Sequence, residues 1–200
     1  DVAPSRGLGD VYKRQAIYRE KKEYEKAREI LDRILEIGLG IDKKIQQALL
    51  FESSGKIEEA YDVYEEILLN NAHEALGAFS LIISLLLKEN KFTEAEECTG
   101  RAKKLVEVFD LGAYRKYTLD LSLAREKQDK EKAIRVITNI VNEADSMNNF
   151  MKSKLYRHRK LKVTHSWSKD EYERLVKQSI KKDKILDLVK NDSRIKFLLK

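Results

Sequence analysis

Apolar residues recur at helical spacing around four alanines in the first two thirds of the chain. Apolar or small residues follow each alanine by four and seven positions, and in three sets an apolar residue precedes it by three. This spacing predicts amphipathic helices with one apolar face. The sets are Tyr24/Ala27/Leu31/Ile34, Ile57/Ala60/Tyr64/Ile67, Phe92/Ala95/Thr99/Ala102 and Ala133/Ile137/Ile140.

The four alanines are separated by 33, 35 and 38 residues. A period in this range is typical of stacked helical hairpins, in which each unit covers the apolar face of its neighbour. No run of alternating apolar and polar residues predicts a strand. The predicted fold class is therefore all-α, with the helices arranged as a right-handed α-solenoid of stacked antiparallel hairpins.

Turn signals divide the pattern into helix pairs, since glycines at 38, 40 and 55 supply helix stops. We expect helical repeats over residues 16–145, followed over 146–200 by a degenerate fifth pair and basic capping helices. From the second pair onward the expected helices are 41–52, 58–69, 78–87, 93–108, 114–125, 130–144, one carrying the apolar stripe Met147/Phe150/Met151/Leu155/Leu161, 168–181, 185–189 and 195–199.

Local motifs add detail to these helices. Thr93 to Glu96 and Ser168 to Glu171 have the spacing of capping boxes, in which a hydroxyl and a carboxylate bond backbone amides at a helix start. Residues 78–87 form the longest apolar run, about half of the ~20 residues that cross a bilayer. We expect this run to be buried between neighbouring repeats, and we expect no membrane partner.

Residues 1–15 do not continue the repeat pattern. They hold the only proline of the chain, together with Gly7 and Gly9, and they begin without methionine. The run from Gly7 to Gln15 resembles the translated sequencing adapter seen at the ends of environmental open reading frames. On that interpretation residues 1–15 are non-native and the chain is a fragment of a larger protein. The alternative is an ordinary disordered terminus.

Composition favours long helices with much polar surface, because 37% of residues are charged, 42% are hydrophobic and one is proline. The single cysteine, Cys98, excludes an intramolecular disulfide, so a cytoplasmic location is expected. The net charge of +6 is uneven, with +10 in residues 151–200 and −4 in residues 1–150. The basic character is therefore a property of the C-terminal part.

The second helix pair resembles a tetratricopeptide repeat (TPR). That family has a small and an aromatic residue in the first helix, glycine or asparagine in the turn, and apolar, alanine and aromatic residues in the second helix. The resemblance covers about residues 16–145, although Asn70-Asn71-Ala72 replaces the proline that usually ends the second helix. It implies a protein-protein interaction scaffold that binds a peptide or protein segment in a concave groove. The matching residues are Ala48, Phe51, Gly55, Ile57, Ala60 and Tyr64.

A clamp of Lys, Asn and Arg that grips peptide carboxylates is known in this family, but it is absent from these repeats. Leu49, Ser84 and Ser122 stand where that clamp needs asparagine. The same register predicts a polar, mildly basic groove, with a solvated helix face as the alternative interpretation. The groove residues are Ser80, Ser84, Lys88, Arg115, Thr118, Ser122 and Arg125.

A basic cluster with an interleaved tyrosine lies between residues 152 and 162. Clustered cations gain free energy by releasing counterions from nucleic-acid phosphates. An RNA or DNA partner is therefore one interpretation, an acidic protein partner is another, and a solvated outer helix is a third. The cluster residues are Lys152, Lys154, Arg157, Arg159, Lys160 and Lys162.

Catalytic and metal-binding patterns are not found. The three histidines, His73, His158 and His165, do not have zinc-motif spacing, and no glycine-rich phosphate loop occurs. We therefore expect no enzymatic activity and no cofactor. The predicted function is a TPR-like scaffold with a protein or peptide partner. The alternative is a nucleic-acid-associated helical-repeat protein that uses the basic C-terminal third.

Overall fold

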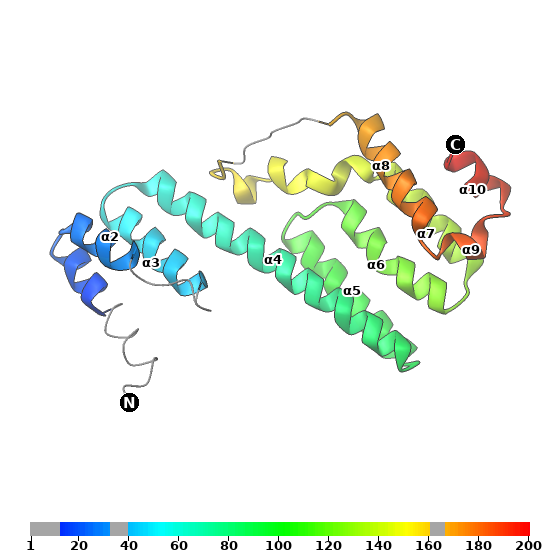
Figure 1. Ribbon diagram of the computed structural model, residues 1–200, viewed down its shortest axis with the longest axis horizontal. Coiled ribbons are helices and arrows are strands. Elements are labelled where there is room, and N and C mark those ends of the chain that lie inside the picture. Colours follow the sequence, from blue (N-terminus) through cyan, green and yellow to red (C-terminus); the bar gives the residue numbers. More distant parts are fainter. Residues whose placement is uncertain (1–12, 33–39, 161–166) are drawn as a thin grey trace. The chain divides into compact units, whose positions relative to one another are not determined.

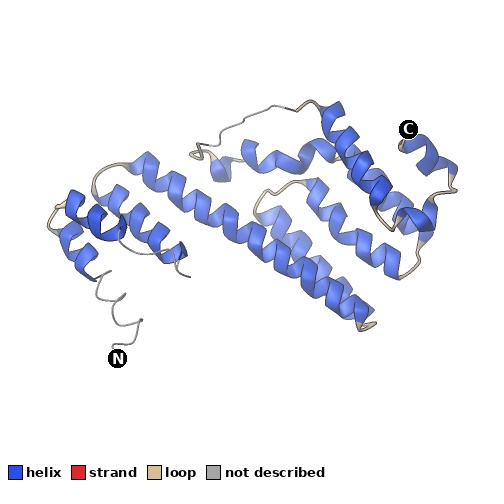
Figure 2. Cartoon of the chain, in the orientation of Figure 1, coloured by secondary structure: helices blue, strands red, loops and turns tan. Residues whose placement is uncertain are grey.

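The computed structural model describes residues 13–32, 40–160 and 167–200 (Figure 1). Every regular element in these ranges is helical and none is a strand (Figure 2), which confirms the all-α prediction. After a helical stretch over 13–20, the α-helices are α2 (Tyr24–Asp32), α3 (Gly40–Ser53), α4 (Ile57–Lys88), α5 (Phe92–Val108), α6 (Ala113–Glu126), α7 (Lys130–Asn142), α8 (Lys169–Lys182), α9 (Leu186–Val189) and α10 (Ser193–Leu198). Two 3-10 segments, η1 (Ala144–Lys152) and η2 (Lys154–Tyr156), lie between α7 and α8.

Most of the predicted N-terminal segment, residues 1–12, lies outside the described residues, as does Lys162 of the basic cluster. Residues 13–15 begin the first helical stretch, and the Gln15 side chain is fully buried. The chain as a whole divides into two compact units. Unit 1 comprises residues 1–70 and 156–161, and unit 2 comprises residues 71–155 and 162–200.

Five helix-to-helix turns in the described ranges share one backbone geometry, and a periodic alanine follows four of them; the fifth, at Asp110 with a φ of 49°, has no such alanine. Each of the four contains one residue with a left-handed φ between 54° and 77°, five positions before one of the periodic alanines. The next amide bonds a carbonyl five residues back, as Lys56 N does to Phe51 O at 2.9 Å. This is the Schellman arrangement that ends a helix. The left-handed residues of the four turns are Lys22, Gly55, Asn90 and Gln128.

The alanine that follows each turn is buried. Ala27, Ala60, Ala95 and Ala133 are 0%, 3%, 0% and 0% exposed. A methyl side chain at these positions lets helices approach to the short end of the 8–10 Å range. The sequence period therefore marks a structural repeat, in which a helix, a Schellman turn and a second helix with a buried alanine follow one another.

The turn expected between residues 69 and 78 does not exist. Figure 1 shows α4 as one unbroken helix, and its bounds give it 32 residues where two helices were predicted. Asn70-Asn71-Ala72 holds neither proline nor glycine, so no backbone donor is removed there, and the two asparagines permit a left-handed turn without requiring one. Leu69, Ala72 and Leu76 continue one buried face through this point at helical spacing.

The apolar run in the second half of α4 is also not buried as predicted. Leu81, Ile82 and Leu85 are 70%, 47% and 57% exposed, while Ile83 and Leu87 are buried. The run therefore packs with one face and presents the other to solvent. Among the described helices, none combines the length and apolarity needed to cross a membrane.

The core of unit 2 is centred on α7. This helix contacts α6, α8, η1, α9 and α10, and α6 also contacts α5. The short helices predicted at 185–189 and 195–199 are confirmed as α9 and α10, and they place Ile185, Val189 and Ile195 in this core.

The segment after α7 differs from the predicted helix. Residues 144–152 and 154–156 form η1 and η2 instead of an α-helix, and Asn148 has non-helical φ and ψ of −114° and 24°. The capping box at Ser168 is confirmed, because Ser168 Oγ accepts from Glu171 N and Glu171 Oε2 accepts from Ser168 N at 2.7 Å. The box at Thr93 is wrong, since α5 begins at Phe92 and its N-cap, Lys91, has no side-chain cap bond.

Candidate functional site

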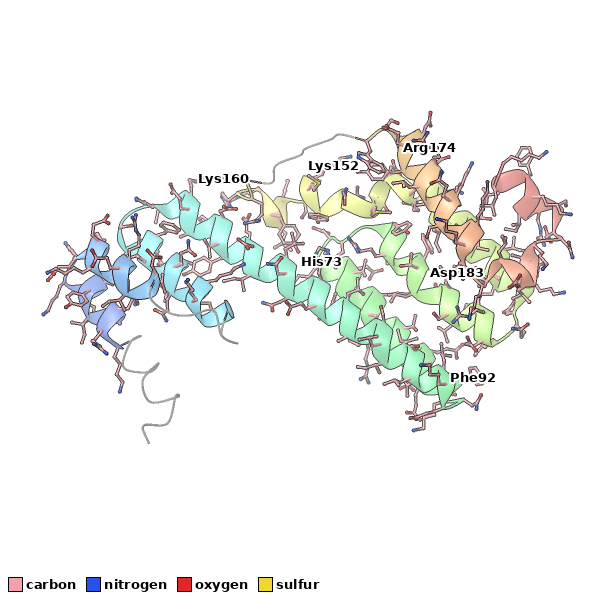
Figure 3. All side chains as sticks on the ribbon, viewed as in Figure 1. His73, Phe92, Lys152, Lys160, Arg174 and Asp183 are labelled. Carbon is pink, nitrogen blue, oxygen red and sulfur yellow. The ribbon has the colours of Figure 1, made fainter. Side chains whose placement is uncertain are left out.

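A cavity of about 420 Å³ lies between α4 and α6 in unit 2. We call it the α4–α6 cavity. Figure 3 labels His73 on α4, beside this cavity. The lining residues are His73, Leu76, Gly77 and Ser80 from α4, and Tyr114, Arg115, Thr118 and Leu119 from α6.

Helical spacing gathers these residues on two facing stripes. On α4 they recur at intervals of three or four, and on α6 they form two adjacent pairs one turn apart. Gly77 contributes space, because a Cβ added there would meet nothing within 4 Å. The His73 ring is held edge-on to the Phe150 ring, with ring centres 5.7 Å apart.

The start of α6 is fixed by Gly112 and Ser146. Gly112 has a φ of 94°, and a Cβ at this residue would lie 1.9 Å from Ser146 O. Ser146 Oγ accepts a hydrogen bond from Tyr114 N at 2.7 Å and donates one to Glu143 O at 2.7 Å. These contacts hold the first turn of α6, which carries Tyr114 and Arg115 into the cavity.

The cavity carries positive charge, and none of the described residues that line it is acidic. Arg115 Nε and His73 Nε2 are buried, and neither has a hydrogen-bond partner in the part of the chain that the structure describes. Burial lowers the pKa of Arg115, but a guanidinium stays charged at any physiological pH. Burial, and secondly the Arg115 charge, lower the pKa of His73, which is therefore neutral at pH 7.

This arrangement suits an acidic or carbonyl oxygen attached to an apolar group. A buried donor left without an acceptor costs about 1–3 kcal/mol, and an entering oxygen removes that penalty. Hydrogen bonds from a charged donor to a carboxylate are about twice as strong as neutral ones. Leu76 and Leu119 supply apolar contact surface beside these donors.

Three of the seven predicted groove residues, Ser80, Arg115 and Thr118, line the cavity. Ser80 Oγ donates to Leu76 O at 3.0 Å, and Thr118 Oγ1 donates to Arg115 O at 2.9 Å, so both hydroxyl donors are already used. The other four do not line it. Ser84 and Lys88 are exposed on α4, Ser122 is half-buried on α6, and Arg125 pairs with Glu126 at 2.9 Å.

Sequence reasoning missed His73, Leu76 and Gly77 because it began the helix at residue 78. On the continuous helix α4 these residues lie seven, four and three positions before Ser80, on the same face. The absence of a proline or glycine near Asn70 was the available signal. Tyr114 and Leu119 also line the cavity and were not predicted. They are sequence neighbours of Arg115 and Thr118, which were predicted.

The predicted basic cluster is divided between the two units. Lys152 and Lys154 belong to unit 2, whereas Arg157, Arg159 and Lys160 belong to unit 1. Arg159 is engaged inside unit 1. Its Nη1 donates to Asp62 Oδ1 at 2.7 Å and lies 3.3 Å from Glu66 Oε2.

The residue before Arg159 is also held by α4. His158 N donates to Glu65 Oε2 at 2.9 Å, and the imidazole stacks on the Tyr61 ring with centres 4.4 Å apart. The segment 156–160 therefore docks on the first half of α4 through charge, and part of the predicted cationic surface is neutralised there.

Comparison of the chain with protein-family models, with curated proteins and with solved structures gave no match. Within the described ranges, no group of three or more His, Cys, Asp or Glu side chains is arranged to hold a metal ion. The α4–α6 cavity is therefore considered on its own chemistry.

Proposed function

We propose that this chain is a helical-repeat interaction scaffold that anchors a peptide or protein segment of a partner in the α4–α6 cavity. The observation that carries the proposal is a pair of buried nitrogens in one cavity, Arg115 Nε and His73 Nε2, for which the described residues supply neither a hydrogen-bond partner nor an acidic lining residue. Such groups are costly in an isolated domain and favourable when a ligand supplies acceptors.

The proposed architecture is a TPR-like α-solenoid. Its support is the fourfold repetition of one Schellman turn followed five residues later by a buried alanine. Helix α4 departs from the regular pattern, because one helix stands where a TPR array has two. The solenoid in this proposal is consequently irregular at α4, which also serves as one wall of the cavity.

A displayed library of random twelve-residue peptides, selected on the full chain, tests the function. Enriched peptides are expected to carry an acidic residue next to an apolar one. Arg115→Gln is expected to weaken binding of such a peptide by about tenfold or more, the loss that follows when a charge-assisted hydrogen bond of roughly 1.5–3 kcal/mol is removed.

Arg125→Gln is the matched control, since it makes the same change on the same helix outside the cavity. The affinity of the Arg125→Gln variant for the selected peptide should stay within about twofold of wild type, a difference that corresponds to roughly 0.4 kcal/mol. A library that yields no acidic consensus would contradict the proposal, and so would equal effects of the two glutamine variants.

A further inference from the structure

We propose that a second surface of unit 2, formed by the end of α8 with α9 and α10, binds an acidic amphipathic segment of a partner protein. An open cleft of about 490 Å³ lies at this surface. We call it the lysine-rimmed cleft. Its lining residues are Lys181, Leu186, Lys190, Ile195, Lys196, Leu199 and Lys200.

The three apolar lining residues, Leu186, Ile195 and Leu199, form an aliphatic floor. Ile195 and Leu199 are themselves buried, so they are held in place by the core beneath them. Phe197, on α10 next to Lys196, is 80% exposed. Phe197 does not line the cleft, but it gives α10 an exposed apolar side chain that a bound partner could also cover, and covering apolar surface gains free energy.

The rim is cationic and largely unneutralised. All four lining lysines are exposed, and Lys190 alone has a carboxylate within ion-pair distance among the described residues, Asp187 at 3.3 Å. That pair is exposed on both sides and contributes little. Among the described residues, no carboxylate lies within ion-pair distance of Lys181, Lys196 or Lys200.

Two carboxylates near the start of α10, Asp192 and Glu131, are already engaged by Arg194, whereas Asp170 and Glu173 on α8 line an adjoining cleft that shares Lys181 and Lys200. Arg194 binds Asp192 at 2.9 Å and Glu131 at 2.7 Å. The Arg194 guanidinium lowers the pKa of Asp192 to about 2, so this carboxylate is ionised and remains with Arg194 at neutral pH. Asp192 and Glu131 therefore do not neutralise the lining lysines, and the described carboxylates form no ion pair with Lys181, Lys196 or Lys200.

The cleft is built on elements that pack against the core of unit 2. Helices α9 and α10 both contact α7, and Ile185, Val189 and Ile195 belong to the core cluster of unit 2. Arg194 ties the start of α10 to Glu131 in the first turn of α7. A site fixed in this way loses little conformational entropy when it binds.

An aliphatic floor inside a ring of lysines selects the ligand class. Apolar side chains at every third or fourth position of a helix would cover the floor, and Asp or Glu between them would face the lysines. Nucleic acid fits less well, because the lining has no aromatic ring on which a base could stack. The ligand class is consequently a segment that combines leucine-like residues with carboxylates.

The probe is a fluorescein-labelled sixteen-residue peptide with leucine at every third or fourth position and glutamate between, titrated into the full chain by anisotropy. Two altered peptides accompany it, one with lysine for every glutamate and one with serine for every leucine. We expect binding of the first peptide alone, because the cleft needs both apolar side chains for its floor and carboxylates for its lysines.

The protein variant is the double change Lys196→Glu and Lys200→Glu, on two exposed lining residues. This double change should weaken the binding of the acidic peptide roughly tenfold. The matched control is Lys182→Glu with Lys184→Glu, which reverses the same number of exposed charges nearby but outside the lining. This control should change the affinity by about twofold or less, since exposed charges away from the contact are screened.

Equal weakening by the two doubles would show long-range attraction without a site and would overturn the proposal. So would binding of the serine peptide as tightly as the leucine peptide. Preferential binding of an oligothymidine or of phosphatidylserine vesicles, lost only in the Lys196/Lys200 double, would overturn it by assigning the cleft to nucleic acid or lipid. The α4–α6 cavity is also proposed to take acidic and apolar side chains, so each titration is repeated in the Arg115→Gln background. The loss caused by the Lys196/Lys200 double is expected to persist there, which separates this outcome from that for the α4–α6 cavity.

Discussion

Arg159 Nη1 donates a hydrogen bond to Asp62 Oδ1 at 2.7 Å across 97 positions of sequence. The two side chains are 15% and 24% exposed, so the pair is partly shielded from water. Arg159 Nη1 also donates to Asp62 O at 3.0 Å, and Lys160 N donates to Asp62 Oδ1 at 3.2 Å. Asp62 is therefore one anchor of the segment 156–160 within unit 1, beside Glu65, which accepts from His158 N.

Removal of this anchor should release the segment 156–160. Arg159→Ala leaves the Asp62 carboxylate without its cation, and the expected loss is about 1–3 kcal/mol of unfolding free energy. Arg157→Ala is the control, because Arg157 is exposed and, among the described residues, its side chain hydrogen-bonds the neighbouring His158 and no carboxylate. Urea unfolding and limited proteolysis near residue 160 would measure both, and similar midpoints for the two variants would contradict this role of Arg159.

Two glycines should respond to alanine in opposite directions. Gly112→Ala forces a Cβ to within 1.9 Å of Ser146 O at a φ of 94°, so we expect a loss of at least ~2 kcal/mol. Gly77→Ala meets nothing within 4 Å inside a helix, and the better helix propensity of alanine should stabilise the protein by about 0.5–1 kcal/mol. Denaturant midpoints that move in the same direction would contradict this account.

The sequence predicted those features of the fold that local requirements decide, and it failed where tertiary packing decides. Ala60 and Gly55 followed from period and turn chemistry, since a small residue at a crossing and a left-handed turn are local requirements. The unbroken α4 did not, because Asn70 and Asn71 are compatible with either a turn or a helix and tertiary packing decides between them. After residue 144 the predicted helix is replaced by 3-10 segments. The spacing of Met147 and Phe150 did not indicate this change.

The candidate site was predicted in part for the same reason. Ser80, Arg115 and Thr118 were found because counting back from an alanine works within one helix pair. His73 was missed because it lay on the far side of a turn that does not form. The pairing of Arg159 with Asp62 could not be predicted, since contacts between residues 97 positions apart depend on the whole fold.

Protonation of His73 should destabilise unit 2. The folded-state pKa of His73 is lowered by burial and by Arg115, whereas the unfolded-state pKa stays near the ordinary value. The unfolded chain therefore binds the proton more readily, and the stability contributed by neutral His73 is present above that ordinary pKa and lost as the pH falls below it.

His73→Gln removes this titration while keeping a neutral polar side chain. The difference in Tm between pH 7.5 and pH 5 should be smaller in the variant than in wild type. Thermal melts followed by circular dichroism at the two pH values would measure it. A variant with the same pH dependence as wild type would show that His73 does not carry the effect.

Nucleic-acid binding by the basic cluster should be weak, sequence-blind and sensitive to salt. Arg159 is held by Asp62 and Glu66, so Lys152, Lys154, Arg157 and Lys160 are the described cations left to meet phosphates. Four contacts to a single strand correspond to a slope of log affinity against log salt of roughly −3. Charge contacts of this kind carry no sequence information, since base edges are not read.

Titration of labelled single-stranded and duplex oligonucleotides at low and physiological salt would measure this slope. Alanine at Lys152, Lys154 and Lys160 should abolish the residual binding, whereas alanine at Lys182 and Lys184 should reduce it only slightly if the cluster is the site. Submicromolar, sequence-dependent affinity at physiological salt that is lost in the triple variant would contradict the expectation and favour the nucleic-acid function over the scaffold.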